Sequence, residues 1–108
     1  MNFTLPMTLC TLAVTASLAT AAGAPSIERG KELFGSTNLG TDGKSCSTCH
    51  SQGKGLVDAA GYDEVRLENI INQCIKKALK GAGFARDSAE LKSLVMYVQT
   101  LANAAKKE

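Results

Sequence analysis

Three residues near the middle of the 108-residue chain have the types and spacing needed for cofactor chemistry. Cys46, Cys49 and His50 form the pattern C-x-x-C-H, the signature of covalent haem attachment. Two thiols at this spacing can add to the two vinyl groups on one edge of a haem, and the next histidine can bind the iron. The motif therefore predicts one covalently bound haem c, attached through Cys46 and Cys49, with His50 as the proximal iron ligand.

Two other uses of a C-x-x-C pair fit the sequence less well. A structural zinc site needs four nitrogen or sulfur ligands, usually with a second Cys/His pair, and His50 is the only histidine in the chain. A thioredoxin-like redox motif requires a surrounding β-α-β pattern, and the sequence shows no strand-like alternation. Haem attachment is therefore the prediction that we carry forward.

The second axial ligand of the iron must come from outside the motif. Met96 is the only methionine beyond the N-terminal segment. At 100° per residue it points about 150° away from the apolar stripe of its predicted helix. Cys74 lies within the apolar stripe of another predicted helix. We favour Cys74 as the distal ligand and keep Met96 as the alternative, while a buried free cysteine that serves as a small hydrophobic residue explains Cys74 equally simply.

Three helices are expected to position these residues. The first follows Ser26, a typical N-cap residue, and covers residues 27–34. The second covers residues 64–80, and Gly81 is expected to end it. Its apolar face consists of Leu67, Ile70, Ile71, Cys74 and Ala78.

The third helix is expected over residues 89–104. Asp87 is its predicted N-cap, and Glu90 stands three residues later, as in a capping box. The stripe expected to be buried consists of Leu91, Leu94, Val95, Val98 and Leu101. Glycine-rich segments before Cys46 and after His50 indicate loops.

The N-terminal segment has the composition of an export signal. The first 27 residues contain no Lys, Arg, Asp or Glu. A moderately apolar run there ends in small residues, which predicts a signal peptide over residues 1–22, cleaved after Ala21 or Ala22. An uncleaved anchor is the alternative, although the run is shorter than the roughly 20 residues that span a bilayer. We therefore expect a bacterial periplasmic protein with no stable membrane insertion once the signal is removed.

The rest of the chain has the size of one small domain, residues 26–104. The net charge of the chain is +2 and the sequence contains no basic stripe, so nothing indicates a nucleic-acid partner. Domains of this size bury little apolar surface and usually need an internal support. A covalently held porphyrin would supply that support.

Three sequence features together resemble class I c-type cytochromes. They are the Gly-x-x-Leu-Phe pattern from Gly30 to Phe34, the C-x-x-C-H motif, and Leu-x-x-Leu-Val-x-Tyr-Val-x-x-Leu from Leu91 to Leu101. The resemblance implies an all-α, cytochrome c-like fold with about three main helices around one covalent haem. It also implies a tight crossing of the first and last helices, with Gly30, Phe34 and Tyr97 at the contact.

The residues around Cys74 resemble a narrower group. Asn72-Gln73-Cys74-Ile75, Leu79-Lys80-Gly81, Asp87-Ser88 and Glu90-Leu91 are similar to a haem domain of Sox complex haem subunits and thiosulfate dehydrogenases. In those proteins the matching cysteine binds the iron opposite the histidine, which implies a His50/Cys74 pair here. Asn72 is a third possibility, because a related group of small high-spin cytochromes uses an asparagine nearby.

These features suggest three functions. The first is a periplasmic carrier that moves single electrons between redox partner proteins through transient docking, rather than an enzyme acting alone. The second is a haem subunit of a thiosulfate-type oxidoreductase, and the third is a gas-binding or sensing cytochrome. Lys44 and Lys54 could steer an acidic partner, although ordinary solvated surface charges explain them equally well.

Overall fold

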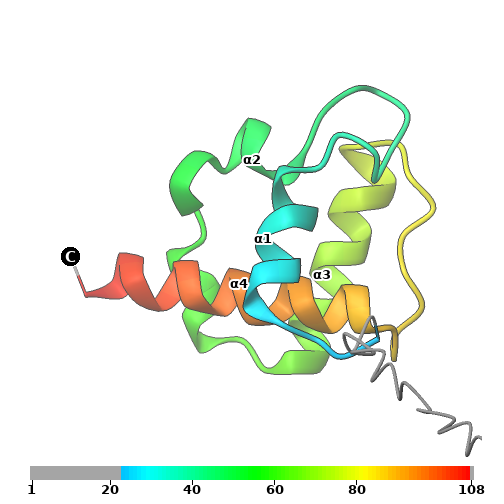
Figure 1. Cartoon of the computed structure of the whole chain (residues 1–108). Coiled ribbons are helices and arrows are strands. Elements are labelled where there is room, and N and C mark those ends of the chain that lie inside the picture. The colour runs from blue at the N-terminus through cyan, green and yellow to red at the C-terminus, as the bar shows by residue number, and fades with distance from the viewer. Residues whose placement is uncertain (1–22, 108) are drawn as a thin grey trace, which may run out of the picture.

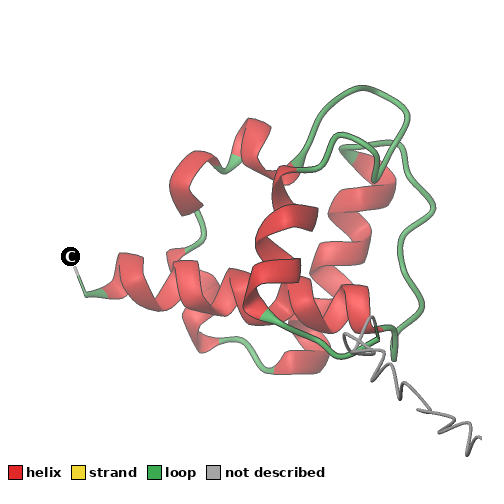
Figure 2. Ribbon diagram, in the orientation of Figure 1, coloured by secondary structure: helices red, strands yellow, loops and turns green. Residues whose placement is uncertain are grey.

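The computed structural model describes residues 23–107, and the predicted signal peptide lies outside the described residues. This part of the chain contains four α-helices and no strand, as the all-α prediction required (Figures 1 and 2). None of its helices is both long and apolar enough to cross a bilayer. In chain order the elements are α1 (Ile27–Gly35), α2 (Cys46–Cys49), the 3-10 turns η1 (Ser51–Gly53) and η2 (Val57–Gly61), α3 (Glu64–Lys77) and α4 (Ala89–Lys106).

The crossing of α1 and α4 is the most extensive contact between elements. Gly30 makes it possible, because a Cβ atom at this position would collide with the backbone carbonyl oxygen of Ser93. Next to it, the Phe34 and Tyr97 rings meet edge to face, with centroids 5.3 Å apart and an interplanar angle of 72°. The contact expected from the cytochrome resemblance is therefore present in the structure.

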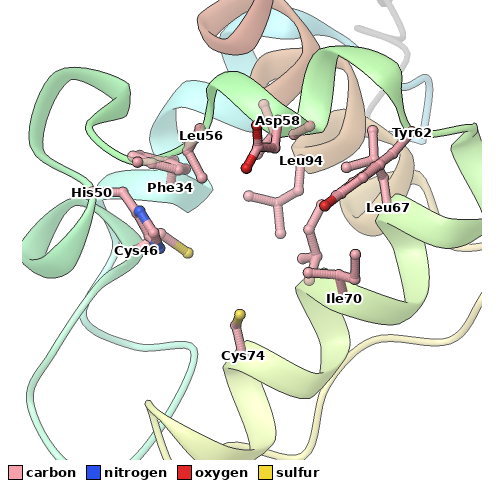
Figure 3. Close-up of a pocket in the computed structure, with 14 residues that line it drawn as sticks. Phe34, Cys46, His50, Leu56, Asp58, Tyr62, Leu67, Ile70, Cys74 and Leu94 are labelled. Carbon is pink, nitrogen blue, oxygen red and sulfur yellow. The ribbon is translucent and has the colours of Figure 1, made fainter.

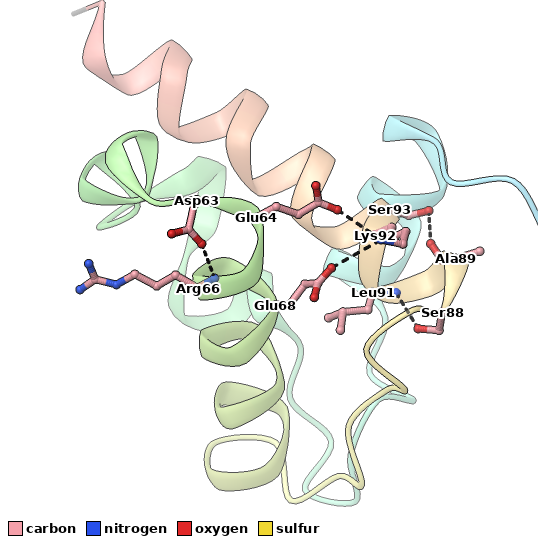
Figure 4. Close-up of polar contacts among 9 residues, drawn as sticks. All are labelled: Asp63, Glu64, Arg66, Glu68, Ser88, Ala89, Leu91, Lys92 and Ser93. Carbon is pink, nitrogen blue, oxygen red and sulfur yellow. Dashed lines mark hydrogen bonds and ion pairs between the residues drawn. The ribbon is translucent and has the colours of Figure 1, made fainter.

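Side-chain caps set where the three longer helices begin. The hydroxyl of Ser26 accepts a hydrogen bond from the Arg29 amide, as predicted. At the start of α4 the prediction was wrong, since Ser88 and not Asp87 caps the helix. The Ser88 hydroxyl accepts from the Leu91 amide at 3.2 Å (Figure 4). Ser88 directly precedes the first helical residue, so its short side chain reaches the free amide, whereas Asp87 lies one position too early.

The buried face of α3 is rotated relative to the predicted stripe. Its buried residues are Leu67, Glu68, Ile71 and Ile75. Ile70 is only partly buried, and Cys74 and Ala78 are exposed. Glu68 enters the interface because the ammonium group of Lys92 on α4 lies 3.7 Å from its carboxylate and 3.3 Å from that of Glu64 (Figure 4). Paired in this way, Glu68 can be buried without leaving an isolated charge.

The end of α3 also differs from the prediction. The helix stops at Lys77, three residues before the predicted end, and the left-handed residue that follows is Lys80, with φ 58°. The Gly81 amide donates to the Ile75 carbonyl oxygen at 2.9 Å, which closes the helix end. Gly81 is required for another reason, since a Cβ atom there would collide with the carbonyl oxygen of Leu39.

We predict that Gly30→Ala destabilises the protein by about 1–3 kcal/mol, because the new methyl group must push α1 away from α4. Gly35→Ala is the matched control on the same helix, since a Cβ atom there meets nothing within 4 Å. We expect the control to change stability by less than about 1 kcal/mol, in the stabilising direction. Urea unfolding followed by circular dichroism measures both, and equal effects would contradict the proposed role of the crossing.

Candidate haem site

Helix α2 is a single turn that carries the two motif thiols. Residues three apart in a helix share a face, so Cys46 and Cys49 lie on the same side of α2. The backbone amide of Ser45 donates to the Thr48 hydroxyl at 2.9 Å and closes the start of the turn. The His50 amide donates to the Cys46 carbonyl oxygen at 2.9 Å, which keeps the imidazole next to the thiols. No pattern in the sequence predicted this helix.

The imidazole of His50 is held in one tautomer. Its Nδ1 lies 2.7 Å from the backbone carbonyl oxygen of Lys54. A carbonyl oxygen can only accept, so Nδ1 carries the proton and Nε2 keeps a free lone pair, the usual arrangement of a metal-binding histidine. Left-handed backbone at Gln52 (φ 55°) and Gly53 (φ 81°) turns the chain so that this carbonyl faces the ring.

A cavity of about 280 Å³ lies beside the motif, and His50, Cys46 and Cys74 all border it (Figure 3). Most of its wall is apolar and comes from α1, η2, α3, α4 and the segments between them. These residues are Phe34, Leu56, Ala59, Tyr62, Leu67, Ile70, Ile71, Leu94 and Val98. A smaller hollow of about 60 Å³ shares the same imidazole and two thiols and adds Cys49.

The donor set around this cavity fits a haem c. Haem needs apolar walls for the porphyrin faces, two thiols for its vinyl groups and a histidine nitrogen for the iron. The apolar side chains, Cys46, Cys49 and the free Nε2 of His50 meet these three requirements. Within residues 23–107, no three His, Cys, Asp or Glu side chains are grouped so that they could hold a bare metal ion.

The structure separates the two candidates for the distal ligand. Cys74 lines the cavity, and in Figure 3 its sulfur is directed from α3 into the same space as the His50 ring. It is exposed, so it is not a buried core cysteine. Met96 is half-buried on α4 and does not line the cavity, in agreement with the angle calculated from the helical period.

The thiols affect one another's ionisation. Burial, with a smaller contribution from the nearby thiol of Cys74, raises the pKa of Cys46 to about 11. Desolvation also raises the pKa of Cys74, with a second contribution from Cys49. All three thiols therefore border one small region, where a cation would favour their charged forms.

Asn72, the third candidate ligand, has another role. Its side-chain nitrogen donates to the carbonyl oxygen of Phe84 at 2.8 Å, and its side-chain oxygen accepts from the Phe84 amide at 2.9 Å. The side chain thus holds the segment between α3 and α4 against α3. Asn72 does not line the cavity.

Two parts of the site could not be recognised as such from the sequence. The partner of His50 is a backbone carbonyl, which any residue type at position 54 would provide, and the adjacent Gly53 and Gly55 indicated only a loop. Asp58 and Tyr62 border the cavity because η2 folds across it. No periodic pattern in the sequence predicts that placement.

The sequence comparison gives an independent indication of the kind of protein. Two sequences of L-cysteine S-thiosulfotransferase subunit SoxA from Hydrogenobacter thermophilus are each 35% identical to the chain over 89 aligned residues. The chain is a distant homologue of SoxA. The match covers 73% of the chain and 34% of SoxA, so the chain spans about a third of the length of this relative. No family model and no solved structure match.

The homology to SoxA agrees with the resemblance seen around Cys74, because that resemblance includes Sox complex haem subunits. SoxA is itself described as a subunit, whereas the first hypothesis concerned a protein that meets its partners only transiently.

We predict that Asn72→Ala lowers the free energy of unfolding by about 1–3 kcal/mol, because the amide and carbonyl groups of Phe84 lose their partners. The visible spectrum of the haem-loaded protein should not change, since Asn72 is not expected to bind iron. Asn69→Ala, an exposed position on the same helix, is the control and should change stability by less than about 0.5 kcal/mol. Altered haem bands in Asn72→Ala would contradict this assignment.

Proposed function

We propose that this chain is an exported, one-haem domain of the SoxA type that works as a subunit of a sulfur-compound oxidoreductase. The domain comprises residues 26–104 and follows a signal peptide over residues 1–22, which would deliver it to the periplasm. The arrangement of His50, Cys46 and Cys74 around one apolar cavity is the observation that carries the proposal. Homology to SoxA supports it.

Each residue of the site has a distinct part in this proposal. Cys46 and Cys49 attach the haem, which supplies a one-electron change between ferric and ferrous iron. His50 would bind the iron through Nε2, and the Lys54 carbonyl fixes the orientation of the ring. Cys74 would supply a thiolate as a second ligand. Because a thiolate stabilises the more highly charged ferric state, this ligand pair favours a low reduction potential.

The chemistry named for SoxA explains why one haem needs partners. Joining the terminal sulfur of thiosulfate to a cysteine thiolate forms one S–S bond and releases two electrons. A single haem accepts one electron at a time, so the second must leave to another redox group. We therefore infer that the chain acts with at least one redox partner protein.

We predict that Cys74→Ser raises the reduction potential by on the order of 0.1 V, a modest part of the ~0.8 V range set by axial ligands. The bands of the low-spin ferric haem should also shift, because the hydroxyl that replaces the thiolate is a weaker donor. Met96→Leu is the control and should leave both properties unchanged. Spectroelectrochemistry measures them, and an unchanged spectrum in Cys74→Ser would exclude Cys74 as a ligand.

The reaction itself is tested by anaerobic incubation of the ferric protein with thiosulfate and L-cysteine. We expect haem reduction together with half an equivalent of S-thiosulfonate product per haem, because each coupling releases two electrons. Cys74→Ser should slow this reaction at least about tenfold, a change of about 1.4 kcal/mol in the barrier. Absorbance and mass spectrometry follow the two products, and haem reduction without coupled product would favour a simple electron carrier.

A further inference from the structure

Two segments that lie far apart in sequence meet backbone to backbone beside the candidate site. One belongs to the loop before α2, and the other follows the C-terminal end of α3 (Figure 1). A Cβ atom at Gly40 would collide with the carbonyl oxygen of Leu79, and a Cβ atom at Gly81 would collide with that of Leu39. Each segment thus has a glycine where the backbone of the other passes. We call residues 39–41 and 79–81 the backbone clasp.

Thr41 holds the clasp closed with two hydrogen bonds. Its backbone amide donates to the carbonyl oxygen of Leu79 at 2.9 Å, and its hydroxyl donates to that of Lys80 at 3.1 Å. The left-handed backbone at Lys80, with φ 58°, turns the chain away from the axis of α3 at this point. Thr41 is exposed, so its hydroxyl adds this contact without taking part in the core.

The clasp is connected to the backbone of Cys74. The amides of Ala78 and Leu79 both donate to the Cys74 carbonyl oxygen, at 2.8 and 3.2 Å. Leu79 therefore donates to Cys74 through its N–H group and accepts from Thr41 through its carbonyl oxygen. Its side chain is buried in the core with 3% of its surface exposed, and closely packed side chains of this kind do not shift freely.

On its other side the clasp leads to the haem-attachment motif. Four residues separate Thr41 from Cys46, and two hydrogen bonds stiffen this connection. The Asp42 carboxylate accepts from the Lys44 amide at 3.1 Å, and the Ser45 amide donates to a hydroxyl of α2 at 2.9 Å. Ser45 is also buried. The position of the motif therefore depends on the position of the clasp.

Direct packing between α2 and α3 contributes little to this arrangement. Among the described elements, α2 makes its extensive contacts with α1 and η1, whereas α3 makes its extensive contact with α4. The smaller hollow lies between the motif and the end of α3, and Leu79 of the clasp lines it together with Cys49 and Cys74. The clasp thus joins the two sides of this hollow by hydrogen bonds.

We propose that Thr41 is a positioning residue for Cys74, because it closes the clasp and so sets the distance between the haem-attachment motif and the thiolate. This inference rests on the proposed function, since it needs a haem held by the motif and bound by Cys74. The end of α3 can move away from the motif only if the hydrogen bonds to Leu79 and Lys80 break. Loosening the clasp should therefore let an added ligand displace the thiolate faster, while the fold stays intact.

The test measures how fast imidazole displaces the thiolate from the ferric, haem-loaded protein, with stopped-flow absorbance of the haem bands as the readout. At saturating imidazole the rate reports dissociation of the native ligand. Thr41→Val keeps the shape of the side chain and the amide bond to Leu79 but loses the hydroxyl bond to Lys80. We expect this rate to rise about fivefold, as loss of one neutral hydrogen bond predicts. Thr41→Ser keeps a hydroxyl and should retain the wild-type rate.

Thr100→Val is the matched control. The Thr100 hydroxyl donates to the Met96 carbonyl oxygen at 2.9 Å, so this variant removes the same kind of bond from another exposed threonine. It should exchange its ligand at the wild-type rate. An unchanged rate in Thr41→Val, or equal acceleration in Thr100→Val, would overturn the proposal.

A double variant shows whether the effect passes through Cys74. In a Cys74→Ser background the thiolate is absent, so adding Thr41→Val should leave the rate of imidazole binding unchanged. A further acceleration of the same size in this background would mean that Thr41 acts on the site in general, and it would overturn the positioning role.

Failure of this inference can be distinguished from failure of the proposed function. Wild-type protein without haem bands, or Cys74→Ser with an unchanged spectrum, would refute the proposed iron site and the positioning role with it. A changed spectrum in Cys74→Ser, combined with equal exchange rates in wild type and Thr41→Val, would refute the positioning role alone.

Discussion

One apolar cavity is the constraint on which the arrangement of the described chain depends. The helices α1, α3 and α4 each contribute side chains to it, and the C-x-x-C-H motif lies at its edge. The close crossing at Gly30 fixes two of these walls, because α1 and α4 can approach only where a side chain is absent. The third wall, α3, carries Ile70 and Cys74 toward the same space. A porphyrin in this position would contact all three helices, as the small size of the domain requires.

The features that depend on residue type and helical period could be predicted from the sequence. Met96 lies away from the cavity as the period of α4 required. The crossing residues Gly30, Phe34 and Tyr97, which the resemblance to cytochromes implied, are also in place. Features decided by competition between neighbouring residues could not be predicted. At the end of α3, Lys80 and not Gly81 adopts the left-handed conformation, and Gly81 is needed instead because the Leu39 carbonyl oxygen leaves no room for a Cβ atom. The N-cap of α4 is a second example, because Asp87 and Ser88 are both typical capping residues and stand next to each other.

Some parts of the candidate site could be predicted from the sequence, and others could not. The motif indicated Cys46, Cys49 and His50, but the backbone groups that orient them carry no signature of their own. Cys74 was expected in the buried stripe of its helix, and it is instead exposed at the edge of the cavity. The difference arises because α3 turns its Leu67, Ile71 and Ile75 face to the core. A cysteine placed in this way can reach a cofactor bound in the cavity.

The most direct test of the central claim is the mass of the mature chain after expression in a periplasm that can attach haem. If Cys46 and Cys49 attach a haem, the mass should exceed that of the processed polypeptide by one haem, with the addition confined to the peptide that contains both cysteines. A colourless product with the mass of the bare polypeptide would contradict it.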